Sequence, residues 1–151
     1  MPDKSTIERA RRDARQGKSA STQAGEFIRD EIRKVRRGEH GVRNTKQAIA
    51  IGLSEARRAG VKLRPPRKGT TSERTRRQAW KASRRAGRPM SQRRSRATLR
   101  ALKREGRSGV SRKALSRQAK ASARRRTARM RSSAARKAAM TRSQRLGRHS
   151  R

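Results

Sequence analysis

Residues that could carry acid–base or metal chemistry are few in this sequence and lie far apart. The chain contains two histidines, His40 and His149, and no cysteine. A metal site or a general base needs a second ligand or an orienting group, and neither histidine has one at a recognisable spacing. We therefore expect no metal site and no cofactor, and we interpret His40 as a loop residue or a phosphate contact.

The other candidates for catalysis are one acidic cluster and two glycine motifs. Glu26, Asp30 and Glu31 would need a cleft that shifts their pKa values to act as an acid–base pair. On an exposed helix among arginines, an ion-paired face is the favoured interpretation. The predicted pairs are Glu26–Arg29 at i,i+3 and Asp30–Lys34 at i,i+4. The "GEHG" segment has neither the spacing nor the preceding strand of a dinucleotide loop, and "GKS" at 17–19 lacks the upstream glycine of a P-loop. The sequence therefore predicts that the protein is not an enzyme.

Positive charge dominates the composition. The chain has 48 Lys and Arg against 10 Asp and Glu, a formal net charge of +38, with 28% apolar and 1% aromatic residues. Low hydrophobicity at high net charge is typical of chains that are only partly ordered. Solubility alone is better served by added acid than by added arginine. Because cations displace the counterions of nucleic-acid phosphates, nucleic acid is the predicted partner, with DNA favoured over RNA.

The candidate contact residues for nucleic acid lie in the basic runs beyond residue 72. Trp80 is the single tryptophan, and two interpretations stay open: a residue that stacks on or wedges between bases, or an apolar anchor for a helix. The predicted nucleic-acid-binding residues are Arg74, Arg76, Arg77, Trp80, Lys81, Arg84, Arg85, Arg93, Arg94, Arg96, Arg124, Arg125 and Arg126.

The helices that would position these residues fall into two groups, one on each side of the segment "RPPRKGTTS". The Pro and Gly residues of this segment interrupt helices. We predict an all-α fold. Residues 1–63 would form a small helical module and residues 64–72 a linker. Residues 73–151 would form a cationic arm that is largely disordered or loosely helical, with helical segments near 91–105 and 111–140. From residue 70 onward the chain holds 29 Lys and Arg but only two acidic residues.

Within the module the pattern predicts three helices, at about 6–16, 22–37 and 44–60. Ser5 and Glu8 have the spacing of a capping box, Asn44 or Thr45 can cap the third helix, and glycines 17, 38 and 60 suit helix ends. Apolar residues at helical spacing predict that the second and third helices pack as a hairpin.

This apolar face is interpreted either as a core or as a surface for a protein partner or self-association through residues 22–60. Its members are Phe27, Ile28, Ile32, Val35, Ile49, Ile51 and Leu53.

Two resemblances add to this interpretation. The stretch "QAIAIGLSEARRAG", Gln47 to Gly60, matches the Q-A-I-A-I-G-L-S-x-A-R-x-A-G core of an uncharacterised family of small basic bacterial proteins, which residues 17–63 resemble. The resemblance implies a bacterial source and carries no established activity. The C-terminal part is similar in composition to the Lys/Arg/Ala-rich tails of bacterial histone-H1-like proteins.

The leading functional hypothesis is a non-enzymatic, nucleoid-associated protein of the bacterial cytoplasm that binds DNA through phosphate contacts, largely without sequence preference. One alternative is an RNA-binding protein, either ribosome-associated or an RNA chaperone. Another is an adaptor that links a protein partner to nucleic acid. No apolar run approaches the roughly 20 residues of a membrane span, so no membrane partner is expected.

Overall fold

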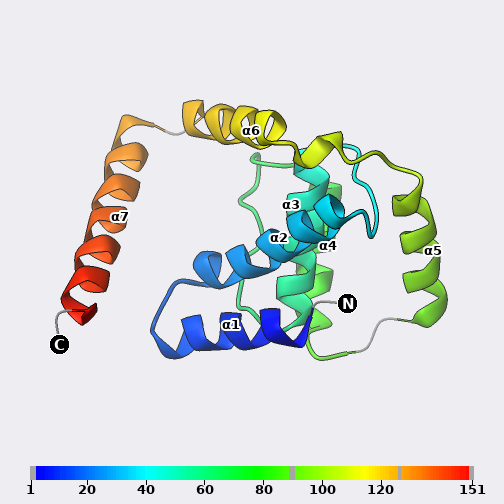
Figure 1. The fold of residues 1–151 in the computed structure, drawn as a ribbon, viewed down its shortest axis with the longest axis horizontal. Helices are drawn as coiled ribbons and strands as arrows, with labels where there is room; N and C mark the ends of the chain where they lie inside the picture. Colours follow the sequence, from blue (N-terminus) through cyan, green and yellow to red (C-terminus); the bar gives the residue numbers. More distant parts are fainter. Residues whose placement is uncertain (1–2, 89–90, 126, 150–151) are drawn as a thin grey trace. The chain divides into compact units, whose positions relative to one another are not determined.

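The computed structural model describes residues 3–88, 91–125 and 127–149 of the chain. Within these residues the secondary structure is helical throughout, without strands, which confirms the predicted all-α class (Figure 1). Residues 1–114 form one compact unit and residues 115–151 a second. The elements are α1 (Lys4–Arg15), α2 (Ala20–Arg37), α3 (Thr45–Arg58), α4 (Glu73–Arg84), α5 (Gln92–Lys103), the 3₁₀ turn η1 (Ser108–Val110), α6 (Arg112–Arg124) and α7 (Ala128–His149).

Side-chain caps determine where α2 and α3 begin. Asn44 Oδ1 accepts a hydrogen bond from the backbone N–H of Gln47 at 3.0 Å, as predicted. The Gln47 side chain in turn accepts from the backbone N–H of Arg43 at 2.7 Å. In α2 the hydroxyl of Ser19 accepts from the N–H of Thr22 at 3.3 Å, so this helix begins two residues before its predicted start. Each cap satisfies backbone donors that the helix itself cannot.

The predicted capping box of α1 is wrong. The N-cap is Asp3, and its side chain makes no capping hydrogen bond. Its carbonyl accepts from the N–H groups of Thr6 and Ile7, so the helical hydrogen bonds start before the predicted cap. Ser5 therefore already lies inside the first turn, where its hydroxyl cannot act as a cap.

Glycine ends α3 where the sequence predicted. Gly60 has φ of 93°, a conformation that residues with a Cβ rarely adopt. The N–H of Val61 donates to the carbonyl of Ala56 at 3.0 Å, the hydrogen bond of a Schellman motif. The turn directs Val61 and Leu63 back onto the core, where both pack.

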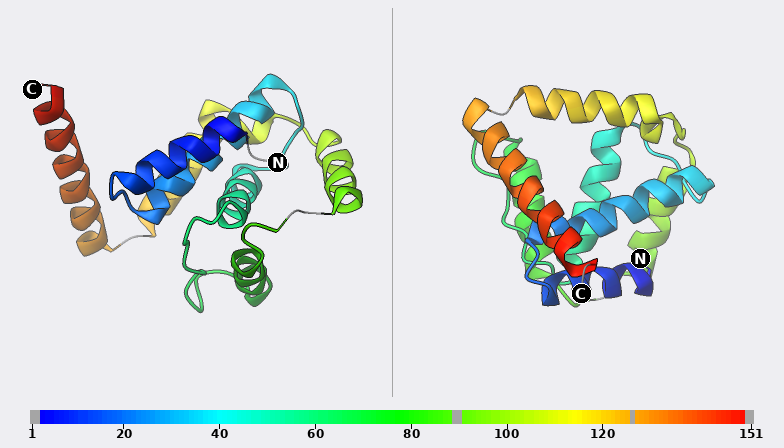
Figure 2. Two further views of the ribbon diagram at one scale, coloured as in Figure 1. Left: turned by 90° about the horizontal axis from the view of Figure 1, so that it is seen from below. Right: turned by 60° about the vertical axis from the view of Figure 1, so that its left-hand side comes forward.

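The predicted hairpin of α2 and α3 is formed, and the two helices cross closely at one glycine. In Figures 1 and 2, α3 crosses α2 while α1 lies along α2, and both pairs are in contact. A Cβ added at Gly52 would lie 2.7 Å from the Cα and 2.9 Å from the N of Ile28. These are backbone atoms that no side-chain rotation can move. Only glycine therefore permits the observed approach of α3 to α2.

Two clusters of buried apolar side chains make up the core, and Phe27 is the one large side chain among their buried members. The first joins α1, α2 and α3 and contains Ala10, Ala24, Phe27 and Ala56. The second joins α2, α3, the loop between them and η1 and contains Val35, Val42, Ala48 and Val110.

The segment around η1 is held against the α2–α3 loop by backbone hydrogen bonds. The N–H of Val42 donates to the carbonyl of Gly106 at 2.8 Å. The buried hydroxyl of Thr45 donates to the carbonyl of Gly109 at 2.6 Å. Val110, which follows at once, is 1% exposed. Residues on both sides of the predicted linker 64–72 therefore share one core.

The C-terminal half contains more distinct helices than the sequence predicted. The predicted segment near 91–105 contains α5. The predicted segment near 111–140 corresponds to two helices, α6, which ends at Arg124, and α7, which begins at Ala128 and continues beyond residue 140 to His149. The helix α4 was not predicted. The sequence does contain a signal for its start, because Ser72 is a residue type that commonly caps helices. In the structure, the Ser72 hydroxyl accepts a hydrogen bond from the N–H of Thr75 at 3.2 Å.

Candidate nucleic-acid interface

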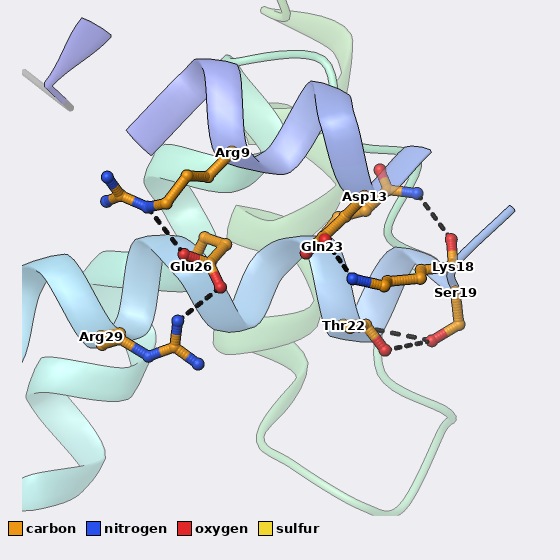
Figure 3. Close-up of polar contacts among 8 residues, drawn as sticks. All are labelled: Arg9, Asp13, Lys18, Ser19, Thr22, Gln23, Glu26 and Arg29. Carbon is orange, nitrogen blue, oxygen red and sulfur yellow. Dashed lines mark hydrogen bonds and ion pairs between the residues drawn. The ribbon is translucent and has the colours of Figure 1, made fainter. Parts of the chain in front are cut away.

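Carboxylates at the α1–α2 contact are neutralised by neighbouring cations (Figure 3). Glu26 accepts from Arg9 at 2.9 Å and from Arg29 at 2.6 Å, and Asp13 accepts from Lys18 at 2.6 Å. The Glu26–Arg29 pair confirms the predicted i,i+3 contact. These acids hold α1 against α2 and leave little negative charge to oppose a polyanion nearby.

A second predicted pair lies deeper in the fold. Lys34 Nζ is 2.8 Å from Asp30 Oδ2, and their side chains are 10% and 5% exposed. The cluster of carboxylates on α2 is therefore an ion-paired face, as expected. It is packed inside the unit instead of facing solvent.

Glu31 and His40 form a contact that the sequence did not reveal. His40 Nε2 lies 3.5 Å from Glu31 Oε2, and the two side chains are 8% and 2% exposed. His40 Nδ1 is 3.1 Å from the carbonyl of Gly41. Because a carbonyl only accepts, Nδ1 carries the hydrogen and Nε2 faces the carboxyl group. His40 lies in a loop, as predicted, and is among the residues that line an open hollow of about 610 Å³, with Gly38, Lys103 and Arg107.

Burial raises the pKa of Glu31 to about 7, and the charge of nearby Glu55 and Asp30 acts in the same direction. His40 and Lys34 act against this increase in pKa. Desolvation is the largest cause, since a buried carboxylate loses its hydration. The proton that Glu31 takes up is therefore held inside the fold, beside His40.

Helix α4 presents a different surface. Ala79 is 8% exposed and is the buried residue of this helix, while the neighbouring Trp80 ring is 50% exposed. The guanidinium carbon of Arg84 lies 4.7 Å from the centre of that ring. This distance is that of a cation–π contact. The helix contacts α3, so Ala79 serves the packing and Trp80 remains accessible.

An open hollow of about 330 Å³ lies beside this ring. It is lined by Trp80, Lys81, Arg84, Arg85 and Arg88, one aromatic ring and four cations without a carboxylate. All of these residues except Arg88 belong to the predicted contact set. Such a lining suits a planar group that carries a neighbouring negative charge.

The remaining predicted contact residues are placed mainly on exposed helix surfaces. Arg76 is partly exposed and pairs with Glu73 at 3.0 Å. Arg126 lies outside the described residues. The exposed members are Arg74, Arg77, Lys81, Arg84, Arg85, Arg93, Arg94, Arg96, Arg124 and Arg125. Arg124 and Arg125 belong to the second compact unit, whereas the contact residues of α4 and α5 belong to the first.

The predicted apolar face is used within this chain. Phe27 and Val35 are fully buried. Ile32, Ile51 and Leu53 pack against the two core clusters. Ile28 lies against Gly52 at the helix crossing, and Ile49 is partly buried. Self-association or a protein partner at residues 22–60 stays a prediction.

Several buried residues were not predicted from the sequence, because they are small, lie far along the chain from their contacts, or carry a charge. Val42 and Val110 are fully buried although they lie outside the predicted helices or beyond the linker. Arg57 lies in the last turn of α3, where the helix dipole favours a cation. It is 7% exposed, burial lowers its pKa, and its Nε is buried without a hydrogen-bond partner among the described residues. The feature of the sequence that could have drawn attention to Arg57 was this position at the end of α3.

Comparison with known proteins gives one match. Residues 4–68 match a family described as a family of unknown function, DUF6496. This agrees with the predicted resemblance to an uncharacterised family; the shared motif and the bacterial source stay predictions. No curated protein and no solved structure matches the chain significantly.

The matched region contains α1 to α3, whereas α4 and its hollow lie beyond it. None of the helices, over the residues described, combines the length and the apolarity that crossing a bilayer requires.

Proposed function

We propose that this protein is a non-enzymatic nucleic-acid-binding protein that contacts DNA phosphates through α4 to α6, largely without sequence preference. One observation carries the proposal. The two acidic residues beyond residue 70, Glu73 and Glu105, both pair with arginines, Arg76 and Arg43, at 3.0 and 3.3 Å. The same region holds 29 Lys and Arg, so its own sequence supplies only these two acidic residues as counter-charge.

Exposed guanidinium groups on short helices suit phosphate oxygens because their planar donors bind in pairs. Such contacts fix the protein on the nucleic acid but do not distinguish one base from another. Counterion release then supplies the main part of the affinity. The mechanism requires neither a cofactor nor a reactive side chain.

We place the protein at the bacterial nucleoid, in the cytoplasm, because the resemblance of residues 17–63 implies a bacterial source and the excess of cations favours DNA as the partner. The α1–α3 module would give the protein a folded body, and the cationic helices would coat or compact DNA. The acidic residues of the module support this division, because they are mostly paired within it.

Salt dependence provides the first test. With full-length protein and a duplex of random sequence, we expect the dissociation constant to rise by about 10³- to 10⁵-fold between 50 and 200 mM salt if 6–10 phosphates are contacted. Fluorescence anisotropy of labelled DNA measures it. An affinity that is equal at both salt concentrations would contradict the proposal.

A matched pair of triple variants locates the binding surface. Replacing Arg93, Arg94 and Arg96 of α5 by alanine should lower the slope of log K against log salt by about 0.9 for each phosphate that the variant no longer binds. The control replaces Arg11, Arg12 and Arg15 of α1, which are equally exposed and carry the same charge. An equal decrease in both variants would show that net charge, and not the proposed surface, determines binding.

The same assay separates DNA from RNA. We expect structured RNA, added at equal phosphate concentration, to displace less than half of the bound duplex. Displacement of most of the duplex would favour the RNA-binding alternative.

A further inference from the structure

The hollow beside Trp80 combines features that uniform phosphate binding does not need. A cationic helix that only follows a phosphate backbone gains nothing from a half-exposed indole, which leaves apolar surface in water. Trp80 is the largest side chain on α4 and is 50% exposed, whereas the small Ala79 beside it is buried. The packing of α4 thus buries Ala79 and leaves about half of Trp80 exposed to solvent.

We propose that Trp80 is a stacking platform for an unpaired base, so that the protein prefers DNA with locally unpaired bases over an intact duplex. This inference rests on the proposed function and specifies its substrate. The ring supplies a flat apolar face, and the surrounding cations of the hollow bind the phosphates that flank the base.

The platform is held in place by the folded unit. Helix α4 contacts α3, and the N–H of Gly87, just after α4, donates to the carbonyl of Arg58 at the end of α3 at 2.9 Å. Ala79 is buried on the same helix. Because the helix is fixed on both sides of Trp80, the ring loses little further freedom when a base stacks on it.

Arg84 orients the ring and supplies charge over one of its faces. Its guanidinium carbon is 4.7 Å from the ring centre, so one face of the indole already has a cationic neighbour. A base on the ring would meet an aromatic surface and a guanidinium that also stacks. Lys81, Arg85 and Arg88 line the same hollow and lie within reach of phosphates.

Intact duplex DNA offers this platform little. Its base faces are covered by their neighbours, and opening one step costs a few kcal/mol. Mismatched or unpaired bases have already lost part of that stacking energy. We therefore expect the protein to prefer DNA with mismatched or unpaired bases, because exposing a base face there costs less free energy.

Trp80 is itself the probe for the test. The sequence contains one Trp and no Tyr, so the intrinsic fluorescence of the full-length protein comes from this ring. Two duplexes of equal length are compared, one fully paired and one with a few central T·T mismatches, which leave the number of phosphates unchanged. Titrations at one salt concentration give the fluorescence change at saturation and the dissociation constant.

We expect tighter binding and stronger fluorescence quenching with the mismatched duplex. Trp80→Ala should weaken binding to it by about 5- to 150-fold, the loss of one base–aromatic stack. Its affinity for the paired duplex should stay within about twofold. Trp80→Phe should recover most of the preference. The control is Leu99→Ala on α5, another exposed apolar residue, 43% exposed, among arginines.

Each outcome distinguishes the two proposals. Equal quenching and equal affinity of the wild type for both duplexes would overturn the stacking platform while leaving phosphate binding intact. A Trp80→Ala variant that keeps the preference would do the same. Failure of the wild type to bind either duplex would overturn the proposed function itself. Helicity by circular dichroism shows that each variant is folded, and the wild-type fluorescence result does not depend on any variant.

Discussion

Glu31 and His40 form a buried contact that can hold a proton, in a protein whose charged residues are mostly Lys and Arg. The carboxyl group is 2% exposed, and burial raises its pKa to about 7. The folded state therefore holds this proton more tightly than the unfolded state, in which the pKa is close to 4.5. The stability that the proton provides is fully present below that value and is lost as pH rises through about 7.

Replacing Glu31 by Gln should remove this dependence on pH. Between about pH 5 and about pH 8 the unfolding free energy of the variant should rise relative to wild type by roughly 1–3 kcal/mol, because ionisation of the buried carboxyl no longer occurs. Denaturant titrations followed by circular dichroism measure both proteins. A difference that is the same at the two pH values would contradict the assignment.

Among side-chain contacts, the sequence predicted the ion pairs that spacing along a helix determines. The pairs Glu26–Arg29 and Asp30–Lys34 follow from neighbouring helical turns, so they could be named before the fold was known. The Glu31–His40 contact depends on how the chain turns back after Gly38, and no helical spacing encodes that turn.

Elements of the N-terminal module are defined by caps and by one very close helix crossing. Their ends and the Asn44 start of α3 were predictable, because glycine ends and Asn caps are local signals. The starts of α1 and α2 lie about two residues before their predicted positions. The crossing was not predictable, because an alanine- and glycine-rich face indicates close packing but not which residue is in contact. Helix α4 was missed since its buried residue is a single alanine, which gives no apolar periodicity.

The α2–α3 crossing predicts opposite effects for two glycine substitutions. Gly52→Ala should destabilise the fold by about 1–2 kcal/mol, because separating the helices costs roughly 1–3 kcal/mol and alanine's helix propensity returns only part of it. Gly25→Ala, in α2, meets no atom within 4 Å. It should stabilise the fold by up to about 1 kcal/mol. Thermal unfolding compares them, and two shifts of the same sign would refute the close crossing.

The compact unit as a whole extends well past the region of family resemblance. Residues 4–68 match the family, yet the unit reaches residue 114 and its second core cluster needs Val110. Composition could not reveal this, because a lone valine among arginines resembles any other position of a basic arm. Only its contact with Val35, Val42 and Ala48 gives it a structural role.

A fragment ending at residue 68 should therefore be less stable than one ending at residue 114. It loses the buried Val110 side chain, worth about 1.5–3 kcal/mol, and leaves the buried Thr45 hydroxyl without the Gly109 carbonyl. Guanidinium unfolding of both fragments measures the difference. In the full chain, Val110→Ala should cost about 2 kcal/mol. Equal stability of the two fragments would show that η1 adds nothing to the core.

The hydrogen bonds between residues 41–42 and residues 102–106 have a consequence for the cationic helices. They turn the stretch from 59 to 101 into a closed loop, with one end continuing from α3 and the other joined to the same core. A tethered loop samples far fewer conformations than a free tail of the same length. Part of the entropy that a basic tail would lose on meeting a polyanion is therefore already lost when this protein folds.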